Sequence, residues 1–347
     1  MLKELIQKLS DMRGVSGFEY RITDKIKDLI NPYADEVSSD ALGNIIAVKR
    51  CGIKNAKRIM IEAHCDEIGL MVTSIDKRGF ITFAPVGGVD PRILPALEVT
   101  VHGKRDVAGI IGAKPPHLQE PDEAKKSAKI KDMAIDVGMS YDKVIEIISV
   151  GDSITFPQSV GSFGKNQFSG KSLDDRASSA ALIEVLKRLQ KVTIEVDVYV
   201  CISVQEEVGL RGATTAAYAI NPDIAVAVDV CHGITPDNSY NAYETGSGCI
   251  ISIGPNIHPA VQKRLSETAR KYNIKTEIDV DSGDTGTDAW AIQVSRSGVP
   301  TALLSIPLKY MHTSVETLSL SDVDAVASLL TFFIQDMEAE TEGWLCC

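Results

Sequence analysis

The stretch VDVYVCISVQEEVGLRG, residues 196–212, is the part of the chain that best indicates the fold. Its first half, residues 196–203, is an almost continuous apolar run, which is typical of a strand covered on both faces of a sheet. The adjacent carboxylates Glu206 and Glu207 follow where this strand is expected to end. Neighbouring strand residues point to opposite faces, so both carboxylates can serve one site only if the strand has already ended at Glu206.

Two further apolar runs predict strands of the same sheet. The run RIMIEAHCDEIG (58–69) carries His64 and Asp66 towards its end, and the run DIAVAVDV (223–230) ends next to Asp229. Strongly periodic stretches with capping signals predict helices over residues 174–191, 258–273 and 319–340. Strands that alternate with helices in this way indicate an α/β sandwich.

Residues 72–163 have a different pattern. Segments such as VTSIDKRGFITFAPVGG (72–88) alternate apolar and polar residues and are separated by glycine-rich turns, which predicts a small β-barrel or β-sandwich. We therefore expect a discontinuous α/β domain, residues 1–71 and 164–347, with a β domain over residues 72–163 inserted into it. The charged stretch 114–132 is predicted to be an exposed loop.

Composition and charge narrow the classes of partner. The 347 residues carry a net charge of −11, which argues against nucleic acid and anionic membranes, because both require a basic face. The sequence has no signal-peptide pattern and no apolar run near the ~18 residues needed to cross a bilayer. Its seven cysteines form no CxxC pair, so the sequence signals neither a disulfide framework nor a thiolate zinc site. We expect a cytoplasmic protein.

Several potential metal ligands fall at the ends of the predicted strands and helices. Ligands of open α/β sheets gather at the carboxyl ends of the strands, which brings such residues together. The candidates are His64, Asp174, Asp175, Glu206, Glu207, Asp229 and His312. Two histidines with three or more carboxylates can hold two divalent ions that share one carboxylate, and Asp66 can orient the imidazole of His64.

This donor set suits zinc, cobalt or manganese better than calcium. One of the two glutamates at 206–207 would then bind metal, and its neighbour would accept a proton from a water molecule at the ions. Each signal also has an ordinary explanation: paired glutamates after a strand can be a solvated turn, and paired aspartates before a helix can be a cap. The spacing alone leaves both interpretations open.

The ordered motifs resemble those of the TET-type, glutamyl-aminopeptidase family of cytosolic di-metal peptidases, some members of which are labelled endoglucanases or cellulases. The motifs that carry this resemblance are AHCDEIGLMV (63–72), GKSLDDRAS (170–178), QEEVGLRGA (205–213), VAVDV (226–230), GTDAW (286–290) and IPLKYMHTSVE (306–316). The resemblance covers essentially the whole chain. It implies a mixed-sheet α/β/α sandwich of the di-zinc aminopeptidase type, interrupted by a barrel-like β domain.

The resemblance also implies roles for single residues. His64, Asp174 and Asp229 would hold one ion, and Asp174, Glu207 and His312 would hold the other. Asp174 would bridge the two ions, next to a cis Asp174–Asp175 peptide. Glu206 would be the general base and acid, and Asp66 would orient His64. These roles imply an aminopeptidase that uses two divalent ions, zinc first and cobalt or manganese as alternatives, to remove N-terminal residues from short peptides.

For the inserted domain the resemblance implies dimerisation, and for the whole protein dimers that assemble into a tetrahedral dodecamer. The loop around His117 and Gln119 is predicted to be solvated, with contact to a neighbouring subunit's active site as the alternative. Two other activities remain as alternatives: a deacylase or carboxypeptidase of the same clan, and a glycoside hydrolase. The latter usually places aromatic platforms beside two carboxyl groups, whereas aromatic residues make up only 5% of this chain.

Overall fold

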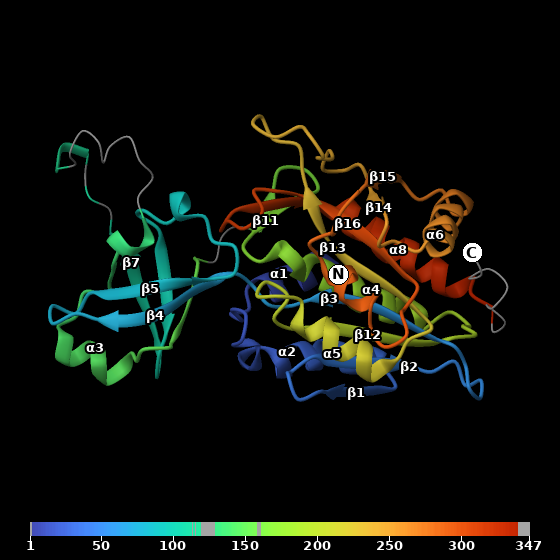
Figure 1. Ribbon diagram of the computed structural model, residues 1–347, viewed down its shortest axis with the longest axis horizontal. Coiled ribbons are helices and arrows are strands. Elements are labelled where there is room, and N and C mark those ends of the chain that lie inside the picture. The colour runs from blue at the N-terminus through green and yellow to red at the C-terminus, as the bar shows by residue number, and fades with distance from the viewer. Residues whose placement is uncertain (1, 113, 115, 119–128, 158–160, 339–347) are drawn as a thin grey trace.

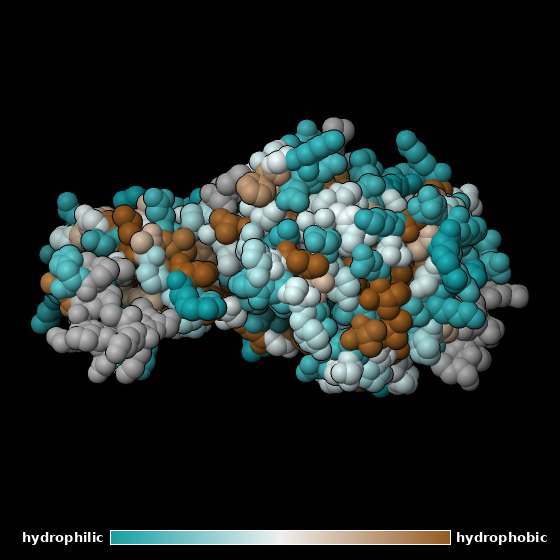
Figure 2. Space-filling view, turned by 90° about the horizontal axis from the view of Figure 1, so that it is seen from above, coloured by the Kyte–Doolittle hydropathy of each residue, from teal (hydrophilic) through white to brown (hydrophobic). Residues whose placement is uncertain are grey.

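The computed structural model describes residues 2–112, 114, 116–118, 129–157 and 161–338. It consists of a large α/β body and a smaller β-barrel that extends from one side of it (Figure 1). The view from above shows the same elongated outline, with the barrel as the narrower end (Figure 2). The α/β class and the barrel-like insertion predicted from the sequence are therefore confirmed.

The centre of the large sheet consists of four parallel strands: β12 (Asp197–Ser203), β3 (Arg58–His64), β13 (Ile224–His232) and β16 (Thr301–Lys309). These are the runs that read as nearly continuous apolar sequence, and almost every residue in them is buried. The sheet is mixed because antiparallel strands complete it. They are β1 (Glu36–Ser39), β2 (Ile45–Lys49), β10 (Ser162–Phe163), β11 (Gln167–Gly170), β14 (Cys249–Ile253) and β17 (Glu316–Ser319), with β15 (Thr276–Val280) parallel to β14.

Helices cover the sheet. Helix α4 (Leu173–Leu189) packs on β3 and β13, and it contacts α1 (Leu2–Ser10) and α8 (Leu320–Gln335). Helix α5 (Arg211–Ile220) instead contacts β12 and α7 (Asp288–Ile292). The remaining helices of the described sandwich are α2 (Thr23–Ile30) and α6 (Pro259–Lys271). Of all helices in the described part of the chain, none has the length and apolar character needed to span a lipid bilayer.

The barrel closes in the strand order β4, β5, β8, β7, β6, β9. Its strands are β4 (Gly69–Ile75), β5 (Ile81–Val86), β6 (Glu98–His102), β7 (Asp106–Ile111), β8 (Ile135–Asp136) and β9 (Ser153–Thr155), with the short helix α3 (Tyr141–Ile147) beside them. The barrel has an apolar core of its own, built around residues such as Val72, Ile81 and Ile154. In the charged loop His117 is exposed, and Gln119 lies outside the described residues.

A buried charge cluster fixes the point where the chain leaves the sandwich for the barrel. Glu67 receives hydrogen bonds from the ammonium of Lys171 at 2.6 Å and from the guanidinium of Arg176 at 3.2 Å. Burial opposes ionisation, but the two cations lower the pKa of Glu67 to about 2. The cluster therefore holds the segment after β3 against the start of α4, which places His64 and Asp174 next to each other.

Candidate active site

The predicted site residues converge at the carboxyl edge of the central parallel strands. His64 is the last residue of β3 and pairs in register with Ser203, the last residue of β12. Asp229 lies near the end of β13, and His312 follows β16. A cavity of about 390 Å³ at this edge is lined by all five predicted ligands, namely His64, Asp174, Glu207, Asp229 and His312, and by Glu206.

Asp174 lies between the two imidazoles. Its Oδ1 atom is 3.2 Å from Nε2 of His64, and its Oδ2 atom is 3.2 Å from Nε2 of His312. Nε2 of His312 is also 3.2 Å from Oε1 of Glu207. Because each carboxylate oxygen faces a different histidine, Asp174 has the geometry of a group shared by two neighbouring ion sites.

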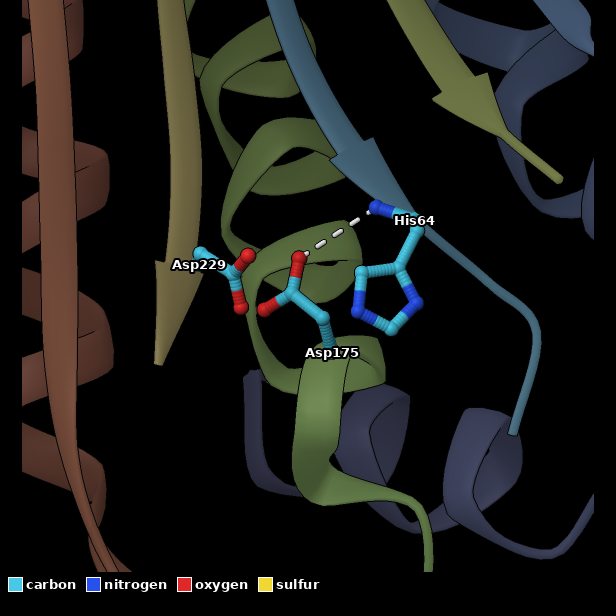
Figure 3. Close-up of side chains that lie close together, drawn as sticks. All are labelled: His64, Asp175 and Asp229. Carbon is cyan, nitrogen blue, oxygen red and sulfur yellow. Dashed lines mark hydrogen bonds between the residues drawn. The ribbon is translucent and has the colours of Figure 1, made fainter. Parts of the chain in front are cut away.

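The side chains form two groups that could each hold an ion, with ligand atoms within 4.8 Å of one another: Asp174, Glu207 and His312 in one, and His64, Asp175 and Asp229 in the other. The first is the set that the family resemblance implied for one ion. In the second, Asp175 takes the place that was assigned to Asp174 (Figure 3). The ion-binding roles of all these residues stay predictions.

Asp175 is the member of this second group that the sequence analysis did not assign to an ion. It is fully buried and follows Asp174 through a cis peptide bond. Its Oδ2 atom accepts a hydrogen bond from the backbone N–H of His64 at 3.3 Å, whereas its Oδ1 atom has no hydrogen-bond partner among the described residues. The doublet at 174–175 was the only sequence signal for it.

The charge balance of the cavity fits bound cations. Burial is the main reason that the pKa of Asp229 rises to about 8, and neighbouring Asp174 contributes. Burial likewise raises the pKa of Glu206 to about 10, with Asp229 and Asp288 adding to the effect. No lysine or arginine is among the described residues that line this cavity. Divalent ions would supply the positive charge that so many buried carboxylates need.

The Nδ1 atom of each histidine faces a backbone carbonyl oxygen, which orients the imidazole ring. Nδ1 of His312 donates a hydrogen bond to the carbonyl oxygen of Gly88 at 3.0 Å, and Nδ1 of His64 lies 3.2 Å from the carbonyl oxygen of Asp66. Such a hydrogen bond fixes the tautomer that leaves Nε2 free to bind a metal. Burial opposes protonation of His312, but Asp174 and Glu207 raise its pKa to about 11.

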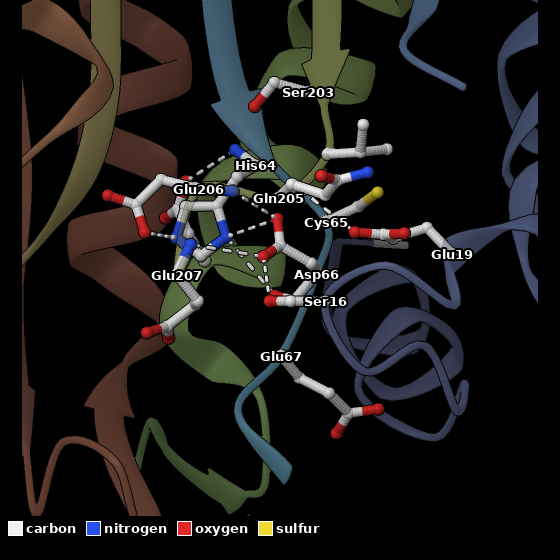
Figure 4. A network of polar contacts seen from close by, with 12 residues as sticks. Ser16, Glu19, His64, Cys65, Asp66, Glu67, Ser203, Gln205, Glu206 and Glu207 are labelled. Carbon is white, nitrogen blue, oxygen red and sulfur yellow. Dashed lines mark hydrogen bonds and ion pairs between the residues drawn. The ribbon is translucent and has the colours of Figure 1, made fainter. Parts of the chain in front are cut away.

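The strand β12 ends at Ser203, so Glu206 and Glu207 lie on a loop rather than on a strand. Both line the cavity, and Oε2 of Glu206 is 3.8 Å from Nε2 of His64. Asp66 holds this loop: its Oδ1 atom accepts the backbone N–H of Glu206 at 3.1 Å, and its Oδ2 atom accepts that of Glu207 at 3.2 Å (Figure 4). Asp66 therefore supports the glutamate pair as well as His64.

Glu316 is a supporting residue that sequence reasoning did not single out. It is buried at the start of β17, and its Oε2 atom accepts the backbone N–H groups of Leu173 at 2.6 Å and Asp174 at 3.2 Å. Its Oε1 atom accepts the backbone N–H of His312 at 2.9 Å. One carboxylate thus fixes the backbone at two predicted ligands that are far apart in the sequence.

A model of the M42 glutamyl aminopeptidase family matches residues 43–329. The chain belongs to this family. A lysyl aminopeptidase from Pyrococcus furiosus is 38% identical over 345 residues, which cover 96% of this chain and 97% of that relative. The predicted family membership is therefore confirmed, and this M42 chain is a peptide hydrolase of the aminopeptidase type.

Solved structures support the same conclusion. A TET aminopeptidase from a marine sediment archaeon of the Thaumarchaeota is similar with a TM-score of 0.92 and 34% identity, over 99% of this chain and 98% of that one. The TET1 peptidase of Pyrococcus horikoshii, which can assemble into a tetrahedron or a large octahedral shell, has a TM-score of 0.86 and 32% identity over 97% and 100% of the two chains. The M42 chain thus shares its complete architecture with TET peptidases.

Proposed function

We propose that this M42 chain uses two divalent ions to remove N-terminal residues from short peptides. The observation that carries the proposal is the position of Asp174, whose two oxygens each lie 3.2 Å from the Nε2 atom of a different histidine. His312 and Glu207 complete one ion site, and His64 and Asp229 contribute to the other. When bound, such ions would acidify a water molecule and polarise the scissile carbonyl group.

Glu206 is the proposed general base. Its carboxylate accepts a proton from the attacking water and passes it to the nitrogen of the leaving amine. Burial raises the pKa of Glu206 in the metal-free protein, whereas two bound cations would lower it, so that the group would be an ionised carboxylate before it accepts the proton. Asp66 holds the backbone of the loop so that the side chain of Glu206 stays in the cavity.

Zinc is the proposed resident metal, with cobalt or manganese as alternatives, because imidazole and carboxylate ligands suit all three. The test is to strip the protein with EDTA, reload it with each metal, and assay peptides with free N-terminal amines. Activity should disappear in the metal-free protein and return on reloading. Equal peptidase activity with and without metal would contradict the proposal. A glycoside hydrolase would instead cleave a sugar substrate, and would do so in EDTA, since that reaction needs no metal.

N-acetylated peptides distinguish the proposed aminopeptidase activity from that of a deacylase or a carboxypeptidase of the same clan. An aminopeptidase should cleave a peptide with a free amine and leave the N-acetylated form of that peptide intact. A deacylase would release acetate from the acetylated peptide, and a carboxypeptidase would shorten both peptides from the other end. Mass spectrometry of the products distinguishes the three results directly.

The preferred N-terminal residue is proposed to be basic. Apart from the predicted ligands and Glu206, the cavity is lined by the carboxylates of Asp279 and Asp281. These can attract a lysine or arginine side chain and would repel an acidic one. The similarity to a lysyl aminopeptidase is consistent with this preference.

Lysyl, leucyl and glutamyl p-nitroanilides test this preference. The lysyl substrate should be cleaved with a kcat/KM about tenfold above the leucyl one, which corresponds to ~1.4 kcal/mol, within the range of a single charge-assisted contact. Replacing Asp281→Asn should reduce this ratio without lowering the rate on the leucyl substrate. A preference for the glutamyl substrate would contradict the proposal.

The barrel is proposed to be the dimerisation domain, and dimers are proposed to assemble into a tetrahedral dodecamer in the cytoplasm. Large apolar side chains are exposed on and beside the barrel, namely Ile110 on β7, Ile145 on α3 and Val150. Exposed apolar side chains can belong to an interaction site. Light scattering tests the assembly, and a mass near that of one chain, 37.5 kDa, in saturating metal would contradict it.

A further inference from the structure

We propose that Glu19 is a positioning residue for Glu206, a role that rests on the proposed function of Glu206 as the base. Glu19 lies on the short 3₁₀ turn Glu19–Arg21 in the N-terminal segment, far in sequence from the glutamate pair, and it is 4% exposed. Its Oε1 atom accepts the backbone N–H of Gln205 at 3.0 Å. Glu19 thus contacts the residue immediately before the proposed base (Figure 4).

The hydrogen bond from Gln205 to Glu19 is one of three made by consecutive backbone N–H groups. The backbone N–H groups of three consecutive residues, Gln205, Glu206 and Glu207, all end on buried carboxylates: the first on Glu19 and the next two on Asp66. Gln205 has a φ of 56°, a left-handed conformation that a residue with a side chain rarely adopts without support. Successive N–H groups in such turns form a concave site for negative charge, and here two side chains of the protein fill it.

The N-terminal segment that carries Glu19 is itself held in place. The same Oε1 atom accepts the backbone N–H of Gly17 at 2.8 Å, the hydroxyl of Ser16 donates to Oδ2 of Asp66, and the backbone N–H of Ser16 donates to the carbonyl oxygen of Glu67 at 3.1 Å. Glu19 therefore connects this N-terminal segment to the loop that carries Glu206 and Glu207. Without its oxygen, the N–H groups of Gly17 and Gln205 would lose their acceptor inside the protein.

The geometry defines an informative pair of variants. Both N–H groups bind the single atom Oε1, so Glu19→Gln can present its amide oxygen to both and keep the arrangement. Glu19→Met has a similar length but no acceptor. A fall in kcat in the methionine variant and its recovery in the glutamine variant would show that Glu19 acts through its hydrogen-bond acceptor, rather than through the charge or the volume of its side chain.

The methionine variant should lower kcat about tenfold to a hundredfold, the range expected when a catalytic group is displaced by about 1 Å, and should leave KM within a few fold. Its content of bound zinc should be unchanged, because Glu19 contacts none of the predicted ligands. Glu19→Gln should restore most of kcat. A folded methionine variant with the kcat of the wild-type protein, or a glutamine variant as impaired as the methionine variant, would overturn the proposal.

Hydrogen–deuterium exchange of the metal-free protein gives a readout that does not depend on activity. Peptides that cover residues 203–210 should exchange faster in Glu19→Met than in the wild-type protein, and unchanged exchange would overturn the proposal. If the wild-type protein has no peptidase activity, the proposed function fails, but exchange still decides whether Glu19 holds the loop. Should Glu19→Met not fold, Glu19→Asp withdraws the oxygen by one methylene while keeping the charge, and the same expectations apply.

Asp322 provides a matched control. It is fully buried, its carboxylate accepts the backbone N–H groups of Gly246 at 2.6 Å and Gly248 at 2.9 Å, and it does not line the active-site cavity. Asp322→Asn should destabilise the protein because a buried acceptor for backbone N–H groups is lost, as it is in Glu19→Met. It should leave kcat and the exchange of residues 203–210 unchanged. A similar fall in kcat would mean that general destabilisation explains the result for Glu19, which would also overturn the proposal.

Discussion

The Oδ2 atom of Asp174 lies 3.2 Å from Nε2 of His312, while the Oδ1 atom of the same carboxylate faces His64 at the same distance. Asp174 lies in the first turn of α4, and His312 follows β16, more than a hundred residues later in the sequence. One carboxylate therefore connects two groups of potential ligands that the sequence keeps well apart. The different positions of Asp174 and His312 in this arrangement lead to different predictions for the two side chains.

Replacing His312→Ala should remove one ion, because His312 contacts only Asp174 and Glu207, whereas the two oxygens of Asp174 face both histidines. Asp174→Asn should weaken both ions, because an amide has one oxygen fewer and cannot serve two sites. The zinc content after dialysis, measured by mass spectrometry, gives the stoichiometry. His232→Ala is the control: His232 lines the cavity but belongs to neither group, so two ions should remain. Equal zinc loss in the His312 and Asp174 variants would contradict the shared role of Asp174.

Glu206→Gln should lower kcat by roughly a hundredfold to ten-thousandfold, because an amide cannot accept and return the proton. Zinc content and thermal stability should stay close to those of the wild-type protein. Glu98→Gln, an exposed position on β6 of the barrel, makes the same chemical change away from the site and should have no effect. Near-wild-type turnover in the Glu206 variant would rule out its role as the base.

Glu316→Gln should weaken zinc binding about tenfold to a hundredfold, the usual effect of losing a group that orients a metal ligand. Both oxygens of Glu316 accept backbone N–H groups, so the NH₂ of glutamine would face a donor instead of an acceptor. Competition with a fluorescent chelator measures the affinity. Asp322→Asn places an NH₂ against a backbone donor elsewhere and should leave zinc affinity unchanged. Unaltered affinity in the Glu316 variant would contradict this role.

Metal-free protein should become less stable as the pH rises from about 5.5 to about 8. The folded pKa values of Asp229, Glu206 and His312 are raised to about 8, about 10 and about 11, respectively. In this range the folded state binds more protons than the unfolded state. The stabilisation from protonated His312 is complete below its unfolded pKa of about 6.5 and is lost as the pH rises through its folded pKa.

Thermal unfolding at several pH values, with and without zinc, tests this dependence. With zinc bound, the protein should instead become more stable as the pH rises, because zinc binds the deprotonated ligands and releases their protons. Calorimetric titration of zinc in buffers with different ionisation enthalpies should therefore show proton release. Metal-free protein whose midpoint rises across this pH range would contradict the assignment of raised pKa values.

The sequence determined the classes of structure and the chemical groups at the site. Apolar runs such as 196–203 predicted the buried central strands. A strand that is covered on both faces carries apolar residues at successive positions instead of alternating apolar and polar ones. The rule that ligands gather at the carboxyl ends of such strands predicted that His64, Asp229 and the glutamate pair lie together, and all of them line one cavity. Asp66 was identified by its place beside His64, whereas the separate roles of Glu206 and Glu207 came from the family resemblance.

Only the tertiary structure decided which carboxylates lie beside which imidazole, and which residues hold them there. Asp174 and Asp175 are neighbours in sequence, yet they fall into different ligand groups. Glu19 and Glu316 act through backbone N–H groups of distant segments. Every residue except proline carries such a donor, so hydrogen bonds to the backbone leave no residue-specific mark in the sequence, and only the folded chain shows which carboxylate they reach.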